Sequence, residues 1–140
     1  MMKVLRINYL AVLVAIVLQF ILGFLWYGPF FGDPWMGMVG LDMQTIEANP
    51  PGAGEWITNV VSAVLSMLVL AWLFKKIGVE SWLRGIWIGF ILGFSLVLMS
   101  NMTSGMFAGD PYGLAWITGG YTTVGLMLGG AVIGGWRRYA

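Results

Sequence analysis

The sequence has 140 residues, of which 59% are hydrophobic and only 9% are charged, and its formal net charge is +1. A soluble domain typically carries about 25% charged residues, so this composition excludes an ordinary water-soluble domain. The chain also contains no cysteine and no histidine. This excludes disulfides and thiol chemistry, and it removes the commonest metal ligand and proton carrier.

Four long stretches contain no Asp, Glu, Lys or Arg: Ile7–Gly32, Trp56–Phe74, Gly85–Gly109 and Pro111–Trp136. Each reaches the roughly 18–20 apolar residues that a helix needs to cross a bilayer. We predict membrane-spanning helices at about 8–28, 56–75, 84–104 and 112–136, within one integral membrane domain that covers residues 1–140. The first stretch is too long for the apolar region of a signal peptide and lacks a small-residue cleavage site, so we interpret it as a retained helix.

The charges indicate the orientation. All seven basic residues fall on one side of the predicted spans, whereas five of the six acids fall on the other side: Asp33, Asp42, Glu47, Glu55 and Asp110. Cytoplasmic loops carry an excess of Lys and Arg. This pattern predicts a multi-pass protein of the bacterial cytoplasmic (inner) membrane with both termini in the cytoplasm.

Three short strings occur twice in the same order. FILGF occupies Phe20–Phe24 and Phe90–Phe94, GDP plus an aromatic residue begins at Gly32 and again at Gly109, and WIT begins at Trp56 and again at Trp116. We infer a duplicated helical hairpin, with repeat halves at about 1–78 and 79–140. Because each half crosses the membrane twice, the halves form a parallel repeat.

The loops that leave the first and third spans also share a predicted capping element. Asp33 and Asp110 are each followed by proline, Pro34 and Pro111, which is typical of an N-cap followed by the first helical position. The first outer loop is longer by about seventeen residues and contains a candidate short helix, Asp42–Ala48, which ends at the prolines of Asn49–Gly52. We expect this segment to lie along the membrane surface.

Small residues recur every four positions on each span, the spacing by which helices approach closely in lipid. The third span has Gly85, Gly89 and Gly93, and the fourth has two pairs, Gly125 with Gly129 and Gly130 with Gly134. The first span has Ala11, Ala15, Gln19 and Gly23 in line, and the second has Thr58, Ser62 and Ser66. These stripes predict the inner faces of an all-α, polytopic membrane four-helix bundle.

No ionisable residue lies at the centre of a predicted span, so the polar candidates for an inner contact are neutral. We select Gln19, Asn59 and Tyr121, of which Gln19 near mid-membrane is the most expensive to bury. Thioethers bind soft Cu(I), so Met99, Met102 and Met106 form a candidate metal site. The structural alternative, in which these methionines only fill gaps in the packing, is favoured by about nine to one.

The residues Asn8–Met36, which include NYLAVLVA and LGFLWYGPFFGDPWM, and Gly119–Arg138, GGYTTVGLMLGGAVIGGWRR, resemble a family of small bacterial membrane proteins grouped as domain of unknown function 1761. The Leu-Trp-Tyr-x-Pro exit of the first span is the most specific part. The resemblance implies a four-helix integral membrane protein and supplies no established activity, ligand or cofactor.

The sequence shows no recognisable catalytic constellation, so an intramembrane enzyme is the least favoured of three hypotheses. The first is a non-catalytic accessory or interaction subunit. The second is a small channel or carrier for a neutral or weakly charged solute, formed by an oligomer. We expect membrane lipid, and a second copy or another membrane protein, as partners, and neither a cofactor nor a nucleic acid.

Overall fold

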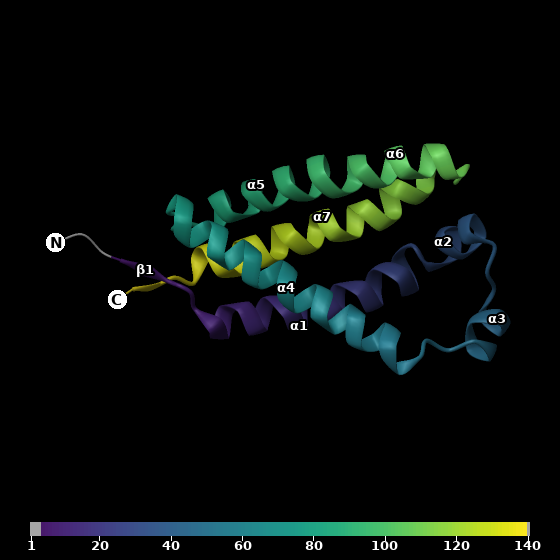
Figure 1. Cartoon of the computed structure of the whole chain (residues 1–140), viewed down its shortest axis with the longest axis horizontal. Helices are drawn as coiled ribbons and strands as arrows, with labels where there is room; N and C mark the ends of the chain where they lie inside the picture. Colours follow the sequence, from purple (N-terminus) through teal and green to yellow (C-terminus); the bar gives the residue numbers. More distant parts are fainter. Residues whose placement is uncertain (1–3, 140) are drawn as a thin grey trace.

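The computed structural model describes residues 4–139, and this part of the chain is almost entirely helical (Figure 1). A two-residue strand, β1 (Leu5–Arg6), precedes the first long helix. The helical segments are α1 (Tyr9–Leu25), η1 (Trp26–Phe30), α2 (Gly32–Val39), α3 (Met43–Ala48), α4 (Ala53–Ile77), α5 (Trp82–Leu92), η2 (Gly93–Leu98), α6 (Met99–Ala108) and α7 (Tyr112–Gly135). The strand β2 (Arg138–Tyr139) follows them.

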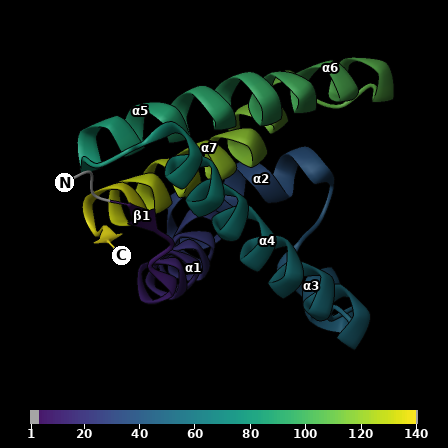
Figure 2. The same ribbon diagram turned by 60° about the vertical axis from the view of Figure 1, so that its left-hand side comes forward.

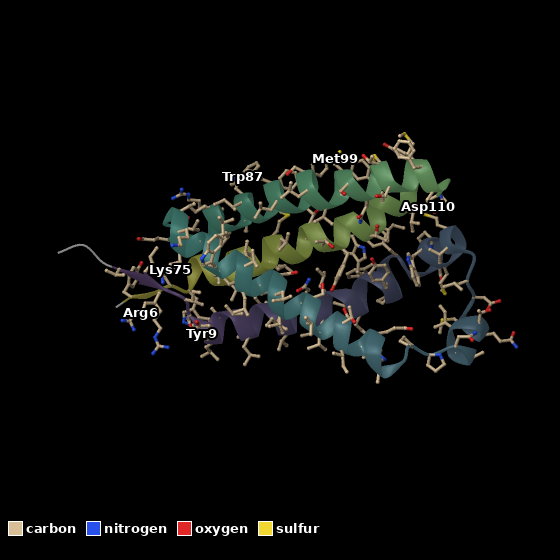
Figure 3. The ribbon with its side chains drawn as sticks, viewed as in Figure 1. Arg6, Tyr9, Lys75, Trp87, Met99 and Asp110 are labelled. Atoms are coloured by element: carbon tan, nitrogen blue, oxygen red, sulfur yellow. The ribbon has the colours of Figure 1, made fainter. Side chains whose placement is uncertain are left out.

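Four helices in the described residues are long and apolar enough to cross a membrane: Tyr9–Phe30, Ala53–Ile77, Trp82–Ala108 and Tyr112–Gly135. They agree with the four predicted spans, and the chain is compatible with a multi-pass membrane protein. Figure 3 shows Arg6 and Lys75 at one end of the helices and Asp110 at the other. We call these the basic end and the acidic end; Lys3, which the sequence also places among the basic residues, lies outside the described part.

α7 lies at the centre of the structure and packs along α5 and η2 through glycines. A Cβ added to Gly85 would lie 2.0 Å from the carbonyl oxygen of Gly130, and one added to Gly89 would lie 2.3 Å from that of Leu126. Real Cβ contacts are never this short, so the two backbones touch directly. One turn after Gly89, at the start of η2, a Cβ built on Gly93 would lie 2.5 Å from the Cα of Thr123.

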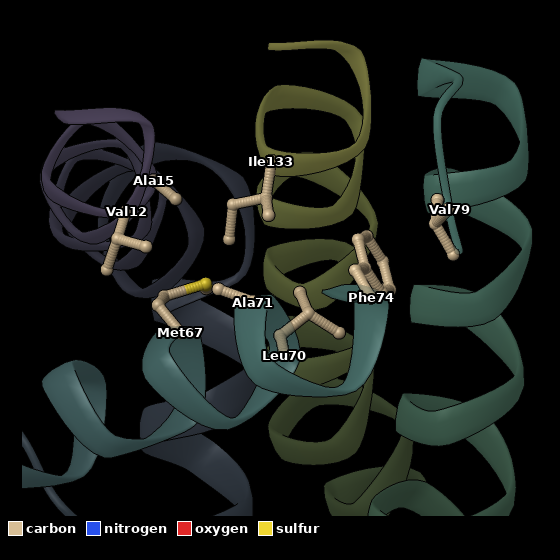
Figure 4. Packing of buried hydrophobic residues seen from close by; sticks show 8 residues of the cluster. All are labelled: Val12, Ala15, Met67, Leu70, Ala71, Phe74, Val79 and Ile133. Carbon is tan, nitrogen blue, oxygen red and sulfur yellow. The ribbon is translucent and has the colours of Figure 1, made fainter. Parts of the chain in front are cut away.

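The other glycine face of α7 receives α1 and α4. A Cβ on Gly129 would lie 2.5 Å from the Sδ of Met67 and 3.7 Å from the Cβ of Ala15. Around this crossing lies the buried core, shown in Figure 4. The core contains Val12 and Ala15 from α1, Met67, Leu70, Ala71 and Phe74 from α4, Val79 before α5, and Ile133 from α7. The core therefore sits toward the basic end.

Hydrogen bonds also close the basic end of the structure. Asn8 is 6% exposed; its Oδ1 accepts from the Ala11 backbone N–H, which caps α1, and its Nδ2 donates to the Trp136 carbonyl 3.2 Å away. Next to it, β1 and β2 pair antiparallel, with Leu5 opposite Tyr139. These contacts join the start of the first span to the end of the fourth.

α4 packs on its neighbours over only part of its length. All of residues 53–62 are exposed, and Ala63 is the first buried residue of the helix. Figure 2 shows this end of α4, together with α3, lying away from the other helices. The prediction that Thr58 and Ser62 face the interior is therefore wrong. Gln19 and Leu22 of α1 lie beside Gly125 of α7, so α1 covers the position that α4 would need to occupy.

The two hairpins consequently pack differently: α5 follows α7 closely, whereas α1 and α4 diverge toward the acidic end. They share one local feature, because the first helix of each hairpin contains a π-helical segment, η1 or η2. The internal repeat stays a prediction.

The predicted capping elements are wrong in detail. α2 begins at Gly32, so Asp33 and Pro34 lie inside its first turn, and no side chain caps the helix. In η1 the Phe31 N–H donates to the Trp26 carbonyl at 2.8 Å, which is the wide turn of a π-helix. Because of this turn, α2 begins at Gly32, one residue before Asp33. α7 begins at Tyr112 with Pro111 as its N-cap, and its preceding residue Asp110 instead completes the turn that ends α6, with its N–H 2.9 Å from the Gly105 carbonyl.

The candidate short helix is confirmed. α3 spans Met43–Ala48, and the Asp42 side chain accepts a hydrogen bond from the Thr45 backbone N–H at 2.7 Å. α3 ends before the two prolines that follow Asn49, and α4 then begins at Ala53 with Gly52 as its N-cap.

The contact between α5 and α7 predicts a sharp effect of a single methyl group. Gly85→Ala places a Cβ against the backbone of Gly130, so we expect a loss of about 1–3 kcal/mol from the free energy of unfolding. Gly54→Ala is the matched control, because nothing lies within 4 Å of a Cβ at Gly54 and alanine favours the helix. Tryptophan fluorescence during denaturation of the purified protein measures both variants. Equal stability of the two variants would contradict the close contact.

Candidate functional site

Two of the three polar candidates, Gln19 and Tyr121, come together where α1 meets α7. The Tyr121 hydroxyl donates a hydrogen bond to the Gln19 backbone carbonyl at 3.0 Å, and both residues are partly buried. Gly23, one turn along α1, lies against the Tyr121 hydroxyl, with 3.0 Å to a built Cβ. The Gln19 Oε1 is buried and accepts no hydrogen bond from the described residues. This contact joins the hairpins through neutral groups.

Asn59, the third candidate, is exposed on the acidic-end segment of α4 (residues 53–62). The prediction that Asn59 is buried is wrong, because α4 diverges from α1 and α7 before this point. In the described residues its side chain makes no hydrogen bond.

An aromatic cluster continues outward from Tyr121. The Tyr27 ring lies 5.5 Å from that of Tyr121 and 5.2 Å from that of Trp35, both in edge-to-face geometry. Trp26 packs against Phe31 at 4.6 Å, and its Nε1–H donates to the Ile117 carbonyl at 2.9 Å. The cluster fixes η1 and α2 against α7, because the π-helical segment turns consecutive aromatic side chains toward different neighbours.

A groove lies beside this cluster, between η1 and α2 on one side and the segment that contains α3 on the other. We call it the acidic-end groove. Its volume is about 790 Å³, within the roughly 300–1,000 Å³ of small-molecule sites. Tyr27, Asp33 and Trp35 line the first side, and apolar and neutral side chains that include Leu41, Thr45 and Ile46 line the second.

The three candidate methionines lie on one helix, α6, at intervals of three and four residues. Met99 and Met102 are partly buried, whereas Met106 is 69% exposed. Met102 and Met106 line a second groove between α6 and α7, together with Asn101 and Thr118. The Asn101 Nδ2 donates a hydrogen bond to the Thr118 hydroxyl at 3.3 Å. No group of three or more His, Cys, Asp or Glu that could hold a metal ion occurs in the described residues. The Cu(I) site at the thioethers stays a hypothesis.

Sequence reasoning did not find the acidic-end groove or the bond from Trp26 to Ile117. The density of aromatic residues between Leu25 and Gly40 was the available signal. It indicates an interfacial segment equally well, since Trp and Tyr are enriched at membrane surfaces. Only the π-helical geometry of η1 decides which rings face α7 and which line the groove.

The family model described as "Protein of unknown function (DUF1761)" matches residues 10–134. The chain belongs to this family. The match confirms the resemblance seen in the sequence and covers all four long helices. No curated protein and no solved structure matches the chain.

The contact between Tyr121 and Gln19 predicts a small, specific loss of stability. Tyr121→Phe removes the hydroxyl but keeps the ring, and hydrogen bonds between helices in membranes contribute about 0.6–1.7 kcal/mol. We expect a loss in this range from the free energy of unfolding. Tyr112→Phe is the control, because Tyr112 is 72% exposed. A Tyr121→Phe variant as stable as the Tyr112→Phe variant would show that the bond contributes nothing.

The cap of α3 predicts a dependence on pH. Hydrogen bonds from the side chain and the backbone N–H of Thr45 lower the pKa of the Asp42 carboxyl below its ordinary value of 3.8. The ionised cap therefore stabilises α3 fully above pH 3.8, and this stabilisation is lost as the pH falls through the lowered pKa.

Amide hydrogen exchange in α3, corrected for the intrinsic rate, measures this effect. Asp42→Asn keeps a capping oxygen that does not titrate, so its protection should not fall over the same range. If Asp42→Asn loses protection on acidification as the natural chain does, the Asp42 cap is not the source of the pH dependence.

Proposed function

We propose that the chain is a non-catalytic subunit of the bacterial cytoplasmic membrane that associates with a second copy of itself through the acidic-end segment of α4. The single observation that supports this proposal is that one face of α4 is buried from Ala63 to Phe74, whereas every residue from 53 to 62 is exposed. The segment is long enough to form a contact with another membrane helix.

The face of α4 that packs in the core continues into this exposed segment. Trp56, Asn59 and Val60 precede Ala63 by seven, four and three residues, the intervals that place side chains on one helix face. The same face next contains Met67, at the centre of the core. The exposed segment therefore presents an extension of a packing surface.

Asn59 favours a protein neighbour over lipid. Its amide carries two donors and one acceptor oxygen, and lipid hydrocarbon offers a partner for none of them. Two copies in the same membrane share one orientation, so a two-fold axis along the membrane normal brings Asn59 opposite itself. Two such amides can pair, because the NH₂ group of each donates a hydrogen bond to the carbonyl oxygen of the other.

The orientation of the chain in the membrane is also proposed, from the distribution of its basic residues. The described basic residues lie at one end of the helices, with β1 and β2, and the positive-inside rule then places both ends of the chain in the cytoplasm. The exposed segment of α4 and the acidic-end groove would lie in the outer half of the membrane.

The alternative function, an oligomeric channel or carrier for a neutral or weakly charged solute, requires a polar path past Gln19, Asn59 and Tyr121. Gln19 and Tyr121 contact each other within the chain, whereas Asn59 contacts neither. Such a path could form only between copies, so the alternative also depends on association.

Single cysteines test the proposal cleanly, because the chain has none of its own. We expect Val60→Cys, which keeps the Asn59 amide, to form a covalent dimer on oxidation of the purified protein in lipid bilayers. Val61→Cys, the next residue along α4, is as exposed as Val60 but lies on another face of the helix, and it should form little. Phe24→Cys on α1, which is 79% exposed, controls for random collision.

Equal cross-linking of Val60→Cys and both controls would overturn the association through this face. An adduct of a different mass, formed by Val60→Cys in native membranes but not by the purified protein, would instead assign the segment to another membrane protein. A dimer with solute flux in liposomes would favour the channel.

A further inference from the structure

We propose that the acidic-end groove binds an amphiphilic organic cation, with its alkylammonium group between the Asp33 carboxylate and the rings of Tyr27 and Trp35. This site is separate from the exposed segment of α4, and the inference does not depend on the proposed association. It follows from the charge, the aromatic residues and the shape of the groove.

The charge of the groove selects a cation. Asp33 is the only charged residue among those that line it. The acids Asp42, Glu47 and Glu55 lie at the same end of the structure, and the described basic side chains belong to the opposite end. This distribution gives the groove a negative potential, which attracts cations and opposes anions.

The aromatic residues add a second recognition element. Tyr27 and Trp35 both line the groove, and their ring planes meet at 72° with centroids 5.2 Å apart. Two rings at this angle present differently directed faces. A cation over the face of Trp or Tyr is attracted by the ring quadrupole, and such pairs recognise alkylated ammonium groups.

The apolar side of the groove selects a cation that carries a hydrocarbon chain. Asp33 is exposed, and an exposed carboxylate alone binds a cation weakly. Leu41, Met43 and Ile46 on the opposite side of the groove provide apolar surface for an attached hydrocarbon chain. A small inorganic cation would use only Asp33, whereas an amphiphilic cation uses all three elements.

The same chemistry has two sources. The groove lies at the end of the apolar span Tyr9–Phe30, at the depth where lipid headgroups meet the hydrocarbon. An ammonium headgroup of a membrane lipid could reach it from the bilayer, and a free amphiphilic cation could reach it from water. Displacement by lipids that differ in headgroup separates these two sources.

Equilibrium dialysis of labelled octyltrimethylammonium against the purified protein in dodecyl maltoside, corrected for empty micelles, tests the site. We expect saturable binding that weakens about two- to fivefold in Asp33→Asn and in Trp35→Leu, with partial recovery in Trp35→Phe. Asp33 is exposed, so Asp33→Asn should leave the fold intact, which circular dichroism verifies. Glu47→Gln is the matched control: it removes an exposed acid of the same end that does not line the groove, and binding should not change.

Octanol and octyl sulfate serve as neutral and anionic probes and should not compete. Displacement of the labelled cation by phosphatidylethanolamine, but not by phosphatidylglycerol, assigns the site to a lipid headgroup, whereas no displacement by either assigns it to a free cation. Equal binding by the natural chain, Asp33→Asn and Glu47→Gln, or competition by octanol as effective as by the unlabelled cation, would overturn the proposal.

Discussion

The backbones of α5 and α7 touch directly, and the position of the first hairpin follows from this contact. Gly85 and Gly130 each lie so close to the other's carbonyl group that a methyl group has no room on either. Helices in lipid gain little by burying leucine, and they associate by such close approach of small residues. This contact places α7 at the centre, with its second glycine face free to receive the first hairpin.

That second face is shared between two helices, and the sharing explains the asymmetry of the structure. Met67 of α4 lies on Gly129, whereas Gln19 of α1 lies beside Gly125. α4 therefore leaves α7 beyond the core, and every residue of its acidic-end segment is exposed. The proposed association and the cation site both belong to this more open, acidic end, but they use different elements: α4 for the first, and η1, α2 and the α3 segment for the second.

Sequence reasoning predicted what depends on local pattern. The four long helices follow from uncharged length, and α3 follows from the Asp42 cap and the prolines after it. The four-residue spacing marks faces of small residues on α5 and α7, but it does not show that Gly85 and Gly130 meet. The prediction failed where the tilt of a helix decides which residues are buried. Asn59 and Ser62 lie on the part of α4 that diverges from α1 and α7, and the spacing of residues along one helix does not show its tilt. It also misplaced Asp33, because a π-helical turn restarts the helix early. The closure of the basic end by Asn8 and Trp136 joins residues 128 positions apart, so no local signal indicates it.

If a second copy covers the exposed segment of α4, the mass of the assembly in lipid must be that of a dimer. Native mass spectrometry of the protein released from lipid nanodiscs should give a dimer of the 15.4 kDa chain. An Asn59→Val variant, which removes the amide but keeps an apolar surface, should shift the population toward the monomer. A natural chain that is monomeric under conditions that preserve bound lipid would rule out association through this segment.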